Sequence, residues 1–156
     1  MKNDISNSQF LDFSIISLKE PDELLQQCEG SNQKKLLVVF DENDENEERK
    51  EFLKKILAAA QFDLQKDTLL LKITPKDSFS FIAFRTKAAD RFGEIDNMLV
   101  FGFPQKHFGI NVNSQNYQPF HFYGCGFLFA DALSELEKNK NLKAALWQGM
   151  QQLFLK

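Results

Sequence analysis

Cysteine is scarce in this sequence of 156 residues. The two cysteines, Cys28 and Cys125, stand far apart and in no CxxC spacing, so neither a disulfide framework nor a zinc site is expected. The N-terminal stretch 1–9 is polar and contains no apolar signal core, and no apolar run approaches the length of a membrane span. These absences predict a cytoplasmic protein with free thiols and no membrane partner.

The sequence also lacks an excess of positive charge. It has 19 basic and 22 acidic residues, a formal net charge of -3 and a pI of about 5.4. Proteins that bind nucleic-acid phosphates usually carry a basic stripe, whereas the lysines here are scattered among acids. Direct binding of nucleic acid is therefore not expected.

The sequence motifs of common enzyme classes are missing. There is no GxxxxGK, HExxH or GxSxG sequence. Residues 124–126 begin a GxGxxG sequence, but Phe129 occupies its third glycine position. The acidic stretch 41–48 lacks the glycine of a calcium loop and is better explained as a solvated loop that leads into a helix.

The nucleophiles and bases of the sequence have no suitable neighbours. His107 and His121 have no carboxylate or nucleophile at a spacing typical of catalysis, and Cys125 has no adjacent cation that lowers the pKa of its thiol. We therefore predict no catalytic residue, no cofactor-binding residue and no metal ligand, and a protein that is not an enzyme.

Phenylalanine is abundant, with 17 residues against one tryptophan and two tyrosines. Most of these rings are expected to fill a core, because burial is the usual fate of this residue. Some of them could instead face a partner protein.

Short apolar runs alternate with amphipathic stretches along the chain. The runs 36–40, 68–73 and 98–101 predict buried strands, and a fourth strand is expected at a sheet edge near 120–123. Helices are predicted over 47–60, 77–91, 131–137 and 139–155, with a helical turn at 21–27. This order predicts a single α/β domain over residues 21–156, a three-layer sandwich with a mainly parallel central sheet and helices on both faces.

The last predicted helix has a pronounced apolar face, and Asn139 or Asn141 can cap its start. Trp147, Met150 and Phe154 share a side of this helix by their i, i+3, i+7 spacing. Trp147 is accordingly expected to be largely buried.

Residues 1–20 are predicted to form a flexible N-terminal tail that holds a short apolar motif. We name Leu11, Phe13, Ile16 and Leu18 the docking motif, because spaced apolar residues behind a polar leader are typical of a segment that folds on binding a partner. The alternative is that this segment packs on its own domain as an extra strand or flap.

One segment has some similarity to the uracil-DNA glycosylases. Those enzymes place a water-activating Asp or Asn between a glycine and a proline just after a strand, whereas this chain has Phe103 between Gly102 and Pro104. The activating acid and one further residue are therefore missing, and no later histidine motif matches.

Four stretches taken in order resemble the psi subunit of the bacterial DNA polymerase III clamp loader, a family whose fold is related to that of the glycosylases without their activity. They are FLDFSIISLKEP, LLVVFDEND, ILAAAQFDLQKDTLLLKITP and DALSELEKNKNLKAALWQGMQQLF. The LKAALWQ sequence of the last helix is the most specific part. The chain departs from the family at Ile16, where an aromatic residue is common, and over 78–122, which matches poorly.

The resemblance implies a non-catalytic adaptor. Psi-like proteins dock an N-terminal segment on the gamma/tau collar of the clamp loader, and their folded domain binds the chi subunit, which binds single-stranded-DNA-binding protein. The docking motif is then the collar contact. The alternatives are a diverged glycosylase-like enzyme of nucleic acids and a homodimeric domain of another role.

Overall fold

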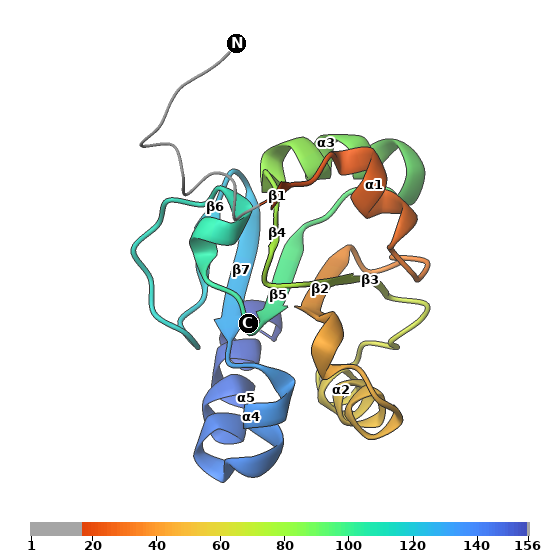
Figure 1. Cartoon of the computed structure of the whole chain (residues 1–156). Helices are drawn as coiled ribbons and strands as arrows, with labels where there is room; N and C mark the ends of the chain where they lie inside the picture. The colour runs from red at the N-terminus through yellow and green to blue at the C-terminus, as the bar shows by residue number, and fades with distance from the viewer. Residues whose placement is uncertain (1–16, 156) are drawn as a thin grey trace.

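A five-stranded sheet forms the centre of the protein in the computed structural model, which describes residues 17–155 (Figure 1). Four neighbouring strands are parallel, and the fifth is antiparallel at one edge. In spatial order the strands are β3 (Thr68–Ile73), β2 (Leu36–Asp41), β5 (Asn97–Phe101), β7 (Cys125–Ala130) and β6 (Phe120–Phe122).

Helices cover both faces of this sheet, which confirms the predicted α/β sandwich with a mainly parallel sheet (Figure 1). One face carries α1 (Pro21–Gln26) and α3 (Phe81–Phe92). The other face carries α2 (Glu47–Ala59), α4 (Leu133–Lys138) and α5 (Lys140–Phe154). Two short 3-10 helices, η2 (Glu42–Asp44) and η3 (Gln105–Phe108), follow β2 and β5.

The alternation of side chains along the strands divides the core in two. Leu37 and Val39 of β2 join the cluster under α1 and α3, whereas Leu36 and Val38 join the cluster under α2, α4 and α5. All four side chains are fully buried. The LLVVF run is therefore apolar throughout because both of its faces are covered.

The helices begin at residues that satisfy their first backbone amides. Asn46 Oδ1 accepts from the Arg49 amide at the start of α2, at 2.8 Å. Asn139 Oδ1 accepts from the amides of Asn141 and Leu142 at the start of α5, at 2.9 and 3.2 Å. Of the two asparagines predicted as caps of this helix, Asn139 is the one used.

Three elements differ from the sequence prediction. The predicted helix over 77–91 begins only at Phe81, because Ser80 Oγ accepts from the Ala83 amide and ends the preceding extended segment. Residues Asp77–Ser78 form strand β4, which pairs in parallel with β1 (Ser17–Leu18) in a separate small sheet. Strand β7 was not predicted, although all six of its residues are buried.

Glycines permit the closest contacts of the sheet with α5. A Cβ on Gly149 would lie 2.8 Å from Leu128 Cδ1 and 3.0 Å from the Tyr117 carbonyl oxygen. A Cβ on Gly126 would lie 2.7 Å from Leu153 Cδ1. Gly126 lies within strand β7, not in the turn between a strand and a helix where a GxGxxG sequence acts. Over residues 17–155, no helix is both long enough and apolar enough to cross a bilayer.

Candidate partner-binding surfaces

The N-terminal segment joins the domain through strand β1. The backbone of Ser17 and Leu18 pairs with Asp77 and Ser78, and the Lys19 amide donates to the Ser78 carbonyl at 2.8 Å. The Lys19 ammonium lies 3.7 Å from Asp77 Oδ1. The chain that follows the docking motif is therefore fixed on β4, beside α1 and α3 (Figure 1).

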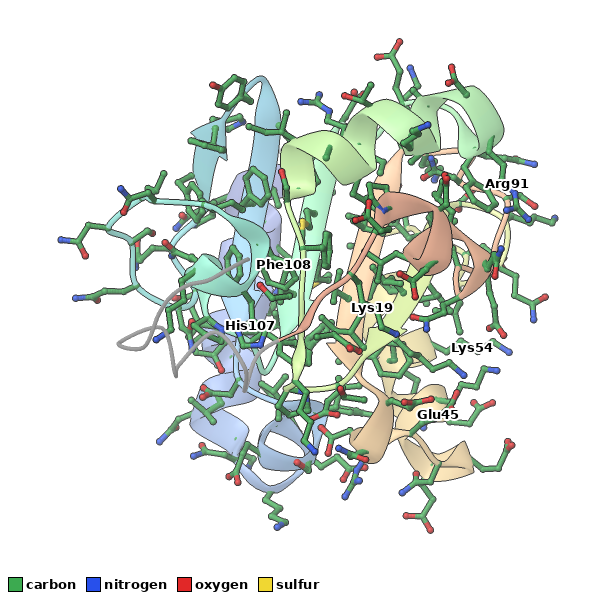
Figure 2. All side chains as sticks on the ribbon, turned by 45° about the horizontal axis from the view of Figure 1, so that its top comes forward. Lys19, Glu45, Lys54, Arg91, His107 and Phe108 are labelled. Atoms are coloured by element: carbon green, nitrogen blue, oxygen red, sulfur yellow. The ribbon has the colours of Figure 1, made fainter. Side chains whose placement is uncertain are left out.

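Helix η3 also contacts β4, through the backbone of His107. The His107 carbonyl accepts from the Phe79 amide at 3.0 Å and from Ser78 Oγ at 3.1 Å. His107 is labelled in Figure 2. Its ring places Nε2 2.9 Å from the Pro75 carbonyl oxygen and lies against the Phe103 ring. These contacts give His107 a structural role in holding β4.

Three of the four residues of the docking motif, Leu11, Phe13 and Ile16, lie outside the described residues. Leu18 is described only through its backbone, as the second residue of β1. The structure therefore fixes the point where the motif meets the domain and leaves its proposed partner contact as a prediction.

The carboxyl ends of β2 and β5 are the place where open parallel sheets usually bind ligands. Asp44, just after β2, fills this position: its Oδ2 accepts from the amide and hydroxyl of Ser134 in α4, at 3.3 and 3.4 Å. Arg49 Nη1 lies 3.6 Å from Asp44 Oδ1, and Arg49 Nε lies 3.2 Å from Glu137 Oε1. The polar groups of this edge thus join η2, α2 and α4 to one another.

The segment after β5 has an apolar residue, Phe103, at the position where the uracil-DNA glycosylases have a water-activating residue. Phe103 is 5% exposed and packs edge-on against Phe108, which is itself buried. Gly102 has a φ of +88°, and a Cβ there would lie 3.2 Å from the Cα of Ala132. A buried phenyl ring has no group that can activate water, so this turn serves packing.

Burial makes both thiols weak acids. It raises the pKa of Cys28 and of Cys125 to about 12, against the weaker opposing effects of Arg91 and Arg85. The Cys28 thiol also donates to the Leu24 carbonyl at 3.4 Å. A thiol of this kind is a poor nucleophile at neutral pH.

Within residues 17–155, no three His, Cys, Asp or Glu side chains are grouped so that they could hold a metal ion.

A groove lies between α2 and α5 on the face of the sheet opposite α1 and α3. It has a volume of about 270 Å³. We name it the α2–α5 groove; it is lined by Phe52, Lys55, Ile56, Ala59, Lys143, Leu146, Trp147 and Met150. The sequence alone gives no sign of this groove, because each helix has an ordinary amphipathic pattern and only the fold places the two helices together.

Trp147 forms part of the wall of this groove. It is half-buried, whereas Leu146 and Met150 beside it are 3% and 1% exposed. Its ring packs at the edge of the core cluster under α2, α4 and α5. Trp147 is therefore both a packing residue and an accessible aromatic surface.

Comparison with known proteins gave no relative: no protein-family model matches the sequence, and a search of curated proteins found no match.

Proposed function

We propose that the protein is a non-catalytic adaptor subunit of the replicative DNA polymerase III clamp loader. Its docking motif binds the gamma/tau collar, and its folded domain binds the chi subunit and, through it, single-stranded-DNA-binding protein. The proposal uses the order of four sequence stretches that resemble the psi family.

The single observation that carries the proposal is the way the last residue of the docking motif joins the domain. The motif ends at β1, which is held on the domain by backbone pairing with β4 and by the Lys19–Asp77 ion pair. A short apolar segment attached to a folded domain by a two-residue strand suits a protein that connects two partners.

The chemistry of the described domain agrees with an adaptor. The carboxyl edge of the sheet is occupied by the contacts of Asp44 with Ser134 and Arg49, and Phe103 stands where a glycosylase needs an acid. The scattered charges and net charge of -3 suit protein contacts better than a phosphate backbone.

Co-purification from host extract tests the proposal. We expect the tagged full chain to retain clamp-loader subunits, and a chain in which Phe13 and Ile16 are both alanine to lose them. A matched variant, Asn3→Ala with Asn7→Ala, changes only the polar leader and should retain the subunits. Absence of clamp-loader subunits from the wild-type sample would overturn the assignment.

A uracil-release assay on single-stranded and duplex DNA distinguishes the adaptor from the alternative function, a diverged glycosylase-like enzyme. We expect no release above a protein-free control. Release that persists through purification and disappears on denaturation of the protein would favour the enzyme.

A further inference from the structure

The two walls of the α2–α5 groove present the same spacing of side chains. Helix α2 contributes Phe52, Lys55, Ile56 and Ala59, at i, i+3, i+4 and i+7. Helix α5 contributes Lys143, Leu146, Trp147 and Met150 at the same intervals. Residues so spaced lie on one side of a helix, so each helix directs a continuous stripe into the groove.

The groove remains open because α2 and α5 pack on α4 and make little contact with each other. Phe52, Ile56 and Trp147 are half-buried in its walls, and Leu146 and Met150 belong to the buried core beneath. Its volume of about 270 Å³ falls just below the range of about 300–1,000 Å³ typical of small-molecule sites. This size suits a few apolar side chains of a partner protein better than a whole small ligand.

The charge of the groove is opposite to that of the protein. Lys55 lies on the α2 wall and Lys143 on the α5 wall, and the Lys143 ammonium is 5.6 Å from the centre of the Phe52 ring. Among the described residues, no acidic side chain lines the groove. A chain of net charge -3 thus places two cations on an apolar surface.

We propose that the α2–α5 groove binds an amphipathic helical segment of a partner protein, with apolar anchors that enter the groove and acidic residues that face Lys55 and Lys143. Helix-in-groove recognition supplies affinity through the anchors, and the two lysines select partners by charge. The proposal goes beyond the clamp-loader assignment and uses none of the residues of the docking motif. The groove proposal can therefore fail while the collar contact is confirmed, and the collar contact can fail while the groove proposal is confirmed.

A display library of helical 16-residue peptides is the probe, selected on the full chain and counter-selected on a Trp147→Ala chain. We expect the enriched peptides to carry aromatic or aliphatic anchors at helical spacing and acids beside them. Enrichment without acids, or no enrichment that depends on Trp147, would overturn the proposal.

The most enriched peptide is then titrated against the variants by fluorescence anisotropy. Lys55→Glu and Lys143→Glu should each weaken binding on the order of tenfold and reduce its salt dependence. Lys54→Glu is the matched control, because Lys54, labelled in Figure 2, has the same charge on the same helix. It lies in a different hollow, lined in part by Glu47, Glu51 and Asp63. Equal loss in Lys54→Glu, or no loss in either groove variant, would contradict the charge selection.

Trp147 is the single tryptophan of the chain, so its emission reports directly on the groove. Binding of the peptide should shift this emission to shorter wavelength as the indole leaves water. Two other occupants would overturn the proposal: a second copy of the chain, seen as a dimer that Trp147→Ala dissociates, and the chain's own N-terminal segment, seen as a change in emission when residues 1–16 are removed.

Discussion

The Lys19 ammonium lies 3.7 Å from the Asp77 carboxylate, and this ion pair links the end of the N-terminal segment to β4. The Lys19 amide reinforces the link through its hydrogen bond to Ser78. A partly exposed ion pair contributes about 1 kcal/mol or less, and a backbone hydrogen bond about 1 kcal/mol. This anchor is small beside the roughly 5–15 kcal/mol of stability of a typical domain.

Removal of the N-terminal segment should therefore leave the domain folded. We expect deletion of residues 1–16 to leave the melting temperature nearly unchanged, because β1 and the Lys19–Asp77 pair remain. Deletion of residues 1–19 should lower the free energy of unfolding by about 1–2 kcal/mol. Thermal denaturation followed by circular dichroism measures both, and unfolding of either truncated chain would show that the segment belongs to the core.

Gly149→Ala should destabilise the protein although alanine favours helices. The new methyl group would lie 3.0 Å from the Tyr117 carbonyl oxygen, and the Tyr117 amide is itself bonded to Phe129 in β7, so this backbone has little room to move. Overpacking costs about 1–3 kcal/mol, against a gain of about 1 kcal/mol in helix propensity. We expect a net loss of about 1 kcal/mol in urea denaturation.

Gln148→Ala is the matched control for this substitution, since Gln148 is the exposed neighbour on α5. Its unfolding free energy should stay within about 0.5 kcal/mol of the wild type. A stabilised Gly149→Ala protein would show that α5 and β7 do not approach as closely as described.

Trp147→Ala should cost less than the loss of a fully buried aromatic residue. Trp147 is half-buried at the groove, so we expect about 1–3 kcal/mol in place of the roughly 3–5 kcal/mol of a core site. Trp147→Phe should lose less than this, because a ring remains against the core. Circular dichroism in denaturant measures both variants, and a loss above about 4 kcal/mol would place Trp147 in the core.

The cysteines make stability depend on pH above neutrality. The pKa of each folded thiol is raised from 9.0 to about 12, so the unfolded chain releases these protons first as the pH rises. The stabilising effect of the neutral thiols is therefore complete below pH 9 and is lost as the pH approaches 12. We expect the free energy of unfolding to fall over this window less steeply in a Cys28→Ala, Cys125→Ala variant.

Thiol reactivity checks the same account. At pH 8, Ellman's reagent should modify the unfolded chain much faster than the folded one, because burial suppresses the thiolate. Equal rates in the two states would contradict the full burial of Cys125 and the partial burial of Cys28.

The fold followed from the sequence wherever a signal was local. The runs LLVVF, TLLLKI and MLVF have continuous apolar character, and the structure places them in three neighbouring parallel strands, β2, β3 and β5. Strand β7 was missed although Phe127–Ala130 form a continuous apolar run; Gly126 precedes this run, and a Cβ there would meet Asn97 Oδ1 of the neighbouring strand and Leu153 Cδ1 of α5.

Features that depend on contacts between distant segments could not be predicted from local sequence patterns. The pairing of β1 with β4 uses backbone hydrogen bonds between segments about 60 residues apart, so it leaves no pattern in the side chains. The α2–α5 groove has the same origin, since Ile56 and Trp147 line one groove only because their helices both pack on α4. The docking motif was found from sequence because its apolar residues follow a polar leader, and its partner contact stays a prediction.

The most direct test of the adaptor role is the affinity of the purified full chain for a reconstituted clamp-loader pentamer, measured by surface plasmon resonance. We predict specific binding that Phe13→Ala and Ile16→Ala each weaken by about 2 kcal/mol, or roughly 30-fold, and that Asn3→Ala with Asn7→Ala leaves unchanged. Wild-type protein that does not bind the pentamer, or binds it equally well with both apolar anchors removed, would contradict the account.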